Sequence, residues 1–240
     1  MTRILGRVVA VNVVHELVPG YFHDTAIDKR PVDGAVDVGA LGLAGDRQID
    51  RSHGGPDKAV YAYAAEDSSW WADELGREIS PGTFGENLTT RGLDVSGAVI
   101  GERWRIGEVL LEVRMPRTPC ENLSARIGIN RFHVRFNASG RIGAMLKVLE
   151  QGAVRAGDRV HVDERPVHGV TVADLANRPG RGADGSTPRL RREPCQERAR
   201  QSPPHRRPSL GRSVGSPAVA EPLTADRCPI APRSATPSRS

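Results

Sequence analysis

The sequence VLLEVRM at residues 109–115 decides the fold class, because apolar residues occupy every second position in it. Side chains of an extended strand point alternately to its two faces, so one face is apolar and buries against a core. That face carries Val109, Leu111, Val113 and Met115. The pattern predicts a half-buried β-strand, and the run at 104–106, on the other side of a Gly-Glu turn, predicts its partner strand.

Short strands are also predicted at the two ends of the region around this hairpin. Val9, Val11 and Val13 alternate in a first strand, and residues 159–162 form a last strand after a Gly-Asp turn. Frequent glycines between residues 34 and 107 are typical of short strands joined by turns. We therefore expect a mainly β, α+β fold, either a barrel or a sandwich, with a few short helices.

Four helices are predicted from apolar spacing and from stop signals. The clearest pattern lies between Gly140 and Gly152, where Ile142, Met145, Leu146 and Leu149 follow helical spacing. Others are expected at about 64–75, ending at Gly76, and from Pro119 and Cys120 to Gly128. A last helix, capped by Thr171, is cut short by the Arg-Pro-Gly sequence at 178–180.

Charge and composition change sharply near residue 178. The 240-residue chain has a net charge of +5, but residues 178–240 hold 13 Arg, no Lys and 5 acidic residues, which leaves the preceding part mildly acidic. That segment also holds 11 of the 18 prolines and none of the ten aromatic residues. We expect it to be a disordered tail. Without interleaved aromatics or lysines it does not indicate specific nucleic-acid binding.

Apolar runs and cysteine positions indicate the cellular compartment and the absence of a disulfide framework. No apolar run approaches the length of about 18–20 residues that spans a bilayer, and the N-terminus lacks a signal-peptide cleavage site, so a cytoplasmic protein without membrane contact is expected. Three scattered cysteines do not suggest a disulfide framework. Cys120 is the one thiol in the part expected to fold.

The first candidate for a binding site is the polar stretch GDRQ at 45–48 followed by HGGPDK at 53–58. Paired glycines let backbone amides approach an anion closely, while Arg47 and Lys58 supply positive charge. Phosphate or another oxyanion fits this chemistry, although the spacing differs from that of a Walker loop. The alternative is a Gly-Pro turn with solvated charges.

The second candidate is MPRTPCENL at 115–123, directly after the predicted core strand. Two prolines stiffen the approach to Cys120, which is expected at the start of a short helix with Arg117 nearby. Such surroundings favour a thiolate that acts as a nucleophile or binds a soft metal. The alternative is that Cys120 is a small buried apolar residue.

A third, weaker candidate is PGTFGENL at 81–88. Glu86 and Asn87 would offer a ligand one carboxylate and one amide, or they would cap a turn. The spacing of Cys and His residues does not match that of zinc sites, and the Gly-x-Ser-x-Gly sequence of serine hydrolases is absent.

Taken in order, GLAGDR at 42–47, HGGPDKAV at 53–60, FGENL at 84–88 and PRTPC at 116–120 resemble the MOSC domain, the family named for the C-terminal part of molybdenum cofactor sulfurase. The resemblance covers about residues 4–176 and is greatest to the bacterial YiiM-type branch. It implies a β-barrel-like MOSC fold that binds molybdenum held by a phosphorylated pterin.

The resemblance also implies roles for individual residues. Cys120 would be the molybdenum ligand, and Asn87 would lie at the pocket wall. The pterin and its phosphate would be held by Arg47, His53, Lys58 and Arg117. The implied activity is reduction of N-hydroxylated compounds, with electrons from a flavoprotein or a similar donor.

Two other functions remain open within the same family. Cys120 would carry a persulfide in a cofactor carrier or sulfur-transfer module, although the chain has no aminotransferase-like domain, so pyridoxal phosphate binding is not expected. Alternatively, the chain would be a non-catalytic remnant whose tail binds polyanions.

The expected organisation is a MOSC domain at 1–165, the start of a truncated helical region at 166–177, and the tail at 178–240. YiiM-type proteins continue into a small helical domain where this chain changes composition. That change resembles translation of a GC-rich gene in another reading frame, and sequencing the locus would test this hypothesis.

Overall fold

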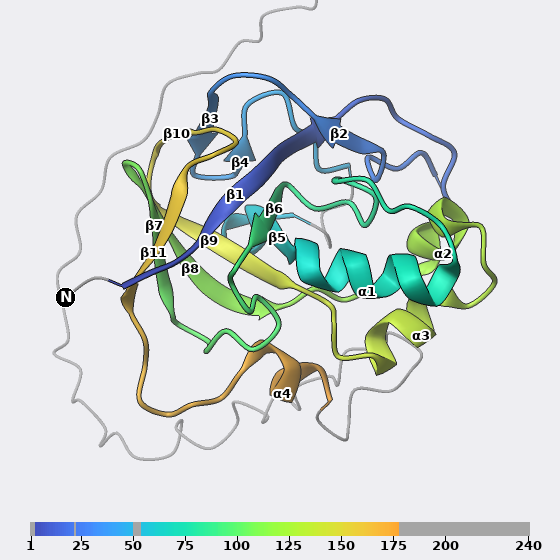
Figure 1. Cartoon of the computed structure of the whole chain (residues 1–240). Coiled ribbons are helices and arrows are strands. Elements are labelled where there is room, and N and C mark those ends of the chain that lie inside the picture. The colour runs from blue at the N-terminus through green and yellow to red at the C-terminus, as the bar shows by residue number, and fades with distance from the viewer. Residues whose placement is uncertain (1–2, 22, 50–53, 178–240) are drawn as a thin grey trace, which may run out of the picture. The chain divides into compact units, whose positions relative to one another are not determined.

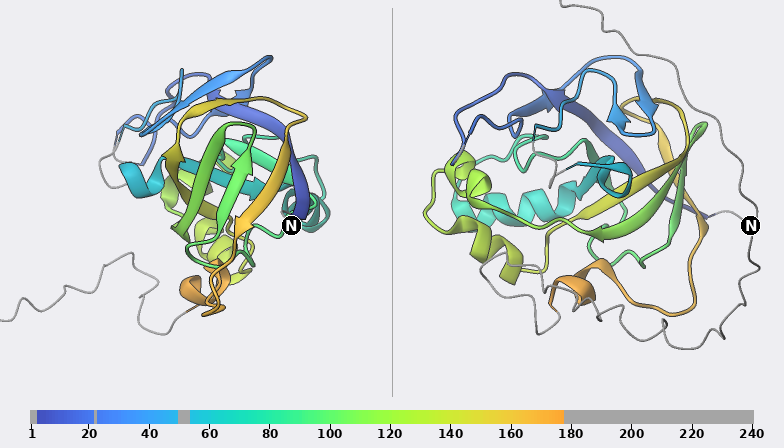
Figure 2. Two further views of the ribbon diagram at one scale, coloured as in Figure 1. Left: turned by 90° about the vertical axis from the view of Figure 1, so that its left-hand side faces the viewer. Right: turned by 180° about the vertical axis from the view of Figure 1, so that it is seen from behind.

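The computed structural model describes residues 3–21, 23–49 and 54–177, with only the backbone of residues 3–5. Seven strands in these ranges form a closed barrel in the order β11-β7-β8-β9-β5-β6-β1, which β1 closes by pairing with β11. Figure 2 shows the strands around a common centre in its left view. They are β1 (Arg3–Val14), β5 (Val60–Ala64), β6 (Leu88–Arg91), β7 (Arg103–Ile106), β8 (Val109–Pro116), β9 (Ala144–Glu150) and β11 (Arg159–Glu164). The expected barrel-like α+β fold is confirmed.

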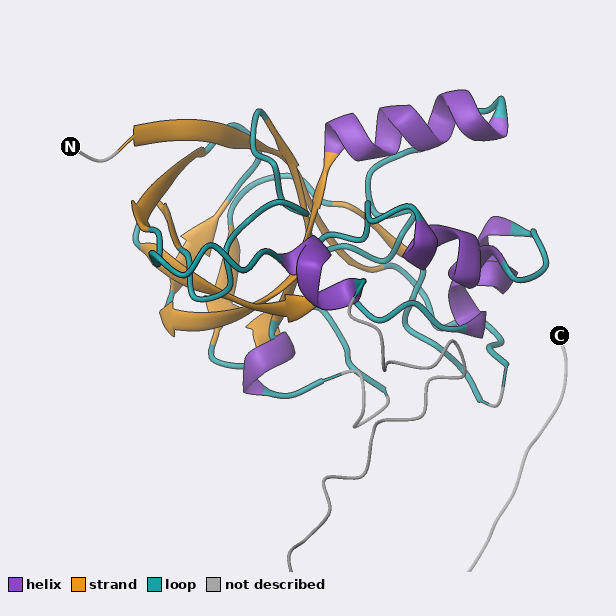
Figure 3. Cartoon of the chain, turned by 90° about the horizontal axis from the view of Figure 1, so that it is seen from below, coloured by secondary structure: helices purple, strands orange, loops and turns teal. Residues whose placement is uncertain are grey.

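Smaller elements surround the barrel (Figure 1). Strand β2 (Lys29–Pro31) extends the sheet beyond β1, and β10, β3 and β4 form a separate three-stranded sheet. The strands of that sheet are β3 (Val36–Gly39), β4 (Gly42–Leu43) and β10 (Gly152–Val154). The helices are η1 (Pro56–Lys58), α1 (Ala65–Leu75), α2 (Glu121–Ile127), α3 (Phe132–Ala138) and α4 (Val172–Ala176). In Figure 3, α1, α2 and α3 gather on one side of the barrel.

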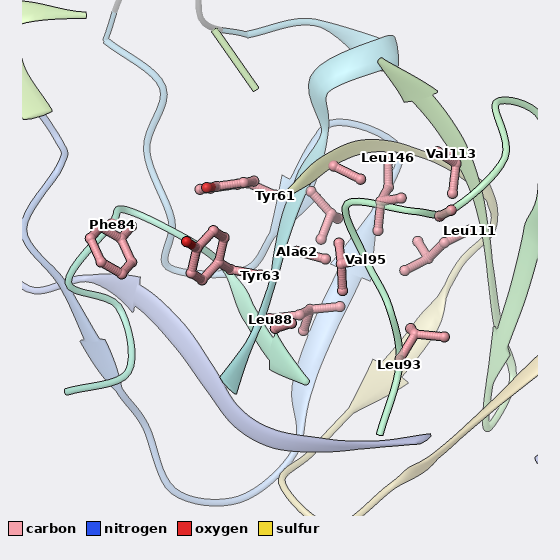
Figure 4. Packing of buried hydrophobic residues seen from close by; sticks show 14 of the residues in the cluster. Tyr61, Ala62, Tyr63, Phe84, Leu88, Leu93, Val95, Leu111, Val113 and Leu146 are labelled. Atoms are coloured by element: carbon pink, nitrogen blue, oxygen red, sulfur yellow. The ribbon is translucent and has the colours of Figure 1, made fainter. Parts of the chain in front are cut away.

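The hairpin of β7 and β8 forms as the alternation at 109–115 predicts. The two strands pair antiparallel across a turn in which Gly107 has a φ of +56°. Val109, Leu111 and Val113 are fully buried, and Met115 is half-buried. Figure 4 shows Leu111 and Val113 beside Leu146 inside the barrel.

The prediction of a helix between Gly140 and Gly152 is wrong, because Ala144–Glu150 forms strand β9. Its residues pair antiparallel with both β5 and β8, so β9 is a central strand of the barrel. Burial follows a period of two, with Ala144, Leu146 and Val148 inside. The apolar residues fit helical and strand spacing alike, and pairing with two neighbours decided between them.

The other helices follow the predictions more closely. Helix α1 ends at Gly76, and α2 ends at Gly128, each glycine in the left-handed conformation that stops a helix. Helix α4 begins at Thr171, whose side chain forms a reciprocal capping box with Asp174. Helix α3 was not predicted, because its apolar residues Phe132 and Phe136 form only one turn of periodic pattern.

Aromatic rings join the helices to the end of the barrel. Trp71 of α1 stacks on Phe136 of α3 with ring centroids 5.6 Å apart, and Phe136 stacks on Tyr63 of β5 at 5.8 Å. Tyr63 also contacts Phe84, which Figure 4 shows beside it. These fully buried rings give the loops above them a rigid base.

Two further predictions are the disordered tail and the lack of a membrane-spanning segment. The expected tail at 178–240 lies outside the described residues. Within the described part of the chain, every helix is too short or too polar to cross a bilayer.

Candidate functional site

A pocket with a cavity volume of about 120 Å³ opens to solvent at the helical end of the barrel. Its walls come from the β1–β2 connection, the loop after β4, η1, β5, the loop before β6, the segment after β8, and β9. Five of the six predicted site residues line it: Arg47, Lys58, Asn87, Arg117 and Cys120. The sixth, His53, lies outside the described residues.

Cys120 lies at the junction of the stiff Pro-rich segment and helix α2. It is the N-cap residue, with extended backbone angles, and its carbonyl accepts a hydrogen bond from Leu123 N at 2.9 Å. Leu123 and Ile127 anchor α2 in the core. The thiol is half-buried, so the reading of Cys120 as a wholly buried apolar residue is not supported.

Arg117 is the most unusual charge in the pocket, because its side chain is buried and forms no ion pair with the residues that the structure describes. The residue is 7% exposed, and its guanidinium lies 5.5 Å from the ring centre of Tyr61 and 5.9 Å from that of Phe136. Its Nη1 atom has no hydrogen-bond partner among the described residues. A buried donor left unpaired costs free energy, so Arg117 is suited to an anionic ligand.

The loop that carries Arg47 is fastened from both sides, which leaves Arg47 itself exposed to the pocket. On one side, Asp46 accepts a hydrogen bond from Val14 N at 3.2 Å. On the other, Gln48 donates to Lys58 O and accepts from Gly55 N, each at 3.3 Å. The GDRQ stretch and the GGPDK stretch therefore form one unit, as an anion-binding loop requires.

Gly55 shows why this unit needs its glycines. Its φ of +102° is one that L side chains rarely adopt. It precedes the short helix η1, which ends at Lys58.

A second buried cation, Lys29, lines the pocket and was missed in the sequence. Its ammonium lies 2.7 Å from Asp46 Oδ2, and the same oxygen accepts a hydrogen bond from Asn87 Nδ2 at 2.7 Å. Burial lowers the pKa of Lys29, while Asp46 opposes that shift. Lys29 stands in a short run of mixed charges without periodicity, so no sequence signal separates it from a surface lysine.

Glu86 and Asn87 have different roles, although they are adjacent. The buried Glu86 carboxylate accepts hydrogen bonds from Gly82 N at 2.7 Å and Phe84 N at 3.1 Å, so it closes a turn rather than facing a ligand. Burial raises its pKa. Asn87 lines the pocket, and its Oδ1 accepts a hydrogen bond from Tyr61 N at 3.1 Å.

Tyr61 forms the aromatic wall under Arg117. Its hydroxyl donates to Ile142 O at 2.9 Å, and burial raises its pKa well above the ordinary value. Tyr61 is therefore a neutral wall of the pocket. Among the described residues, His, Cys, Asp and Glu side chains form no cluster of three or more that would hold a bare metal ion.

Comparison with known proteins gives the family. Residues 50–161 match the family model of the MOSC domain. The chain is 38% identical to the uncharacterized protein YflK of Bacillus subtilis over 156 residues, which cover 65% of this chain and 70% of YflK. This chain belongs to the MOSC domain family. The protein YiiM of Escherichia coli is 36% identical over 63% of the chain and 69% of YiiM.

Solved structures agree with this MOSC assignment. YiiM from Geobacillus stearothermophilus superposes with a TM-score of 0.59 and 28% identity, covering 71% of this chain and 82% of that one. YiiM from Escherichia coli gives 0.56 and 29%, covering 71% and 75%. A protein of Gibberella moniliformis named "Reductase" is 36% identical over 59% of this chain but only 26% of its own length.

Proposed function

We propose that this MOSC protein is a molybdenum-cofactor-dependent reductase of N-hydroxylated compounds, with Cys120 as the protein ligand to molybdenum. One observation carries the proposal: the Cys120 thiol lines the same pocket as the buried Arg117, whose Nη1 has no hydrogen-bond partner among the described residues. A thiolate suits a soft metal, and a guanidinium with an unused donor suits an anion. A metal carried by a phosphorylated pterin has both properties.

The pocket residues fit such a cofactor in charge as well. Arg47, Lys58 and Arg117 line one pocket in which Asp24 is the acidic lining residue within the described ranges. We assign these three cations, together with His53, to the pterin and its phosphate. Asn87 belongs to the wall, because its amide already bonds Asp46 and its carbonyl already accepts from Tyr61 N.

The reaction consumes two electrons and two protons: R–NHOH becomes R–NH₂ and water. When bound, the cofactor supplies a metal centre that exchanges electrons with the substrate. We assign the electrons to a flavoprotein or similar donor. The chain's own part is to hold the ligands in a fixed orientation against the rigid base of Tyr61 and Phe136.

Membership of the MOSC family, and a relative named "Reductase", support the reductive assignment. The sulfur-transfer alternative makes a different prediction for the same thiol, namely a persulfide on Cys120. The experiment below separates the two.

The test is metal content of the full chain, purified from a host that makes the cofactor. Near-stoichiometric molybdenum is expected in the wild type and a large loss in Cys120→Ala. Glu74→Gln, which alters an exposed ion pair with Arg135, is the matched control and should keep its metal. Equal molybdenum in wild type and Cys120→Ala would defeat the ligand assignment. Little metal together with a persulfide on Cys120 would favour sulfur transfer.

A further experiment separates the domain from its C-terminal segment. Deletion of residues 178–240 should leave reduction of an N-hydroxylated purine unchanged. Loss of activity would show that the segment contributes to function.

A further inference from the structure

Strand β2 and the residue before it carry two buried charges, each paired with a different part of the molecule. Asp28 is 1% exposed and Lys29 is 8% exposed, although they are neighbours in the chain. Asp28 is the central residue of a tight turn in which Lys29 N donates to Ile27 O at 2.9 Å, and β2 begins at Lys29. Each of them forms an ion pair with a different element that lines the pocket.

Asp28 is connected both to Arg30 of β2, whose Nη2 lies 2.9 Å from Oδ2, and to helix α2. Its Oδ1 lies 2.6 Å from Arg126 Nη2, near the end of the helix that begins after Cys120. A second contact holds the first turn of the same helix, because Tyr21 N donates to Asn122 Oδ1 at 2.8 Å. The segment before β2 therefore holds α2 at both of its ends.

Lys29 is connected to the Arg47 loop. Its ion pair with Asp46 also includes the Asn87 amide and Val14 N, so the Asp46 carboxylate receives donors from β1, β2 and the loop before β6. The Asp46 side chain is only 4% exposed. Ion pairs this deeply buried have well-defined geometry, because a misplaced partner leaves an unsolvated charge.

We propose that Asp28 and Asp46 are positioning residues. They fix helix α2 and the loop that carries Arg47 to one short segment, residues 28–29, and so set the position of Cys120 relative to Arg47. This inference rests on the proposed function for the meaning of that placement. Neither carboxylate is assigned to touch the substrate or the cofactor. Each acts through the residue it holds: Asp28 through Arg126, and Asp46 through Lys29 and Asn87.

The test uses the full chain without cofactor and two independent measurements. The first is the alkylation rate of Cys120 by iodoacetamide, quantified on its own peptide by mass spectrometry. The second is inorganic phosphate binding, followed by NMR of side-chain amines. The chain has three lysines, Lys29, Lys58 and Lys147, so selective lysine labelling gives a readily assigned spectrum.

Asp28→Asn should raise the alkylation rate about threefold or more, because α2 loses a tether, with little change in phosphate affinity. Arg126→Met should do the same, and the double variant should add nothing further. Glu74→Gln is again the control. Restoration of the wild-type rate by Asp28→Glu would support a positioning role.

Asp46→Asn should weaken phosphate binding about fivefold while Cys120 alkylation stays at the wild-type rate. A purely electrostatic role predicts the opposite sign, because the variant pocket gains one net positive charge. The double variant Lys29→Met/Asp46→Asn keeps the net charge of the pair at zero. It replaces the single variant in the test if Asp46→Asn does not fold. We expect it to weaken phosphate binding as well.

Two outcomes would overturn the inference. One is tighter phosphate binding in Asp46→Asn. The other is that Asp28→Asn and Asp46→Asn each change both the alkylation rate of Cys120 and the phosphate affinity. Failure of the proposed function looks different. It would appear in the wild type, as a Lys58 signal that phosphate does not shift.

Discussion

Two buried cations line the same pocket, and they differ in what balances them. Lys29 has a carboxylate 2.7 Å away, whereas Arg117 lies on two aromatic rings and its Nη1 finds no hydrogen-bond partner in the described part of the chain. The first arrangement is complete within the protein, and we propose that a ligand completes the second. Positive charge in a pocket therefore does not by itself indicate a binding residue, because a buried cation such as Lys29 can be satisfied within the protein.

The largest expected effect concerns the balanced cation. Asp46→Ala should lower the free energy of unfolding by about 3–5 kcal/mol, because it leaves the Lys29 ammonium buried without a partner. Urea denaturation followed by circular dichroism measures it. A loss below about 1 kcal/mol would mean that water reaches Lys29 readily, and the contrast with Arg117 would disappear.

Arg117→Met should change stability far less, within about 1 kcal/mol, because the lost ring contacts are offset by removal of an unpaired buried donor. Its effect should appear in ligand binding instead. Phosphate should raise the Tm of the wild type but not of this variant. A stability loss as large as that of Asp46→Ala would show that Arg117 is a structural residue.

The pH dependence of stability sharpens the same contrast. Burial lowers the pKa of Lys29, so in the window between that value and the unfolded value of about 10.4 the unfolded chain binds more protons. Stability relative to Lys29→Met should therefore rise as pH increases through this window. Thermal unfolding of both proteins from neutral pH upward measures the difference, and a flat difference would contradict the lowered pKa.

The smallest effect is expected for an ion pair on the surface. Glu74 and Arg135 are both more than two-fifths exposed, so Glu74→Gln should change the unfolding free energy by less than about 0.5 kcal/mol. The same denaturation assay gives this reference value. A loss comparable to that of Asp46→Ala would show that burial is not what distinguishes the Lys29 pair.

The sequence predicts four of the seven barrel strands, β1, β7, β8 and β11, and it predicts the pocket residues where short-range chemistry decides the structure. Alternation at 109–115 and glycines at helix ends act locally, and five of six site residues proved to share one pocket. The failures depend on long-range pairing. The apolar spacing in β9 fits both a helix and a strand, and only its pairing with β5 and β8 makes it a strand.

Lys29 illustrates a second limit. Its importance comes from Asp46, which lies in another loop, and from burial that no local pattern encodes. By contrast, Arg117 was found because it stands three residues before a cysteine in a proline-stiffened segment. A functional residue can be recognised in a sequence when its neighbours along the chain form a characteristic motif. It cannot be recognised when its role depends on a partner far away in the sequence.

The closure of the barrel by β1 and β11 has a consequence for biosynthesis. The first strand of the chain acquires one neighbour only after the segment Arg159–Glu164 has been made, so the ring cannot be completed early in translation. Such sequence-distant pairing slows folding and leaves strand edges exposed in the meantime. The pocket draws on residues from 23 to 145, so it too is assembled late. Any cofactor would then be acquired only after synthesis has passed the barrel-closing strand at Arg159–Glu164.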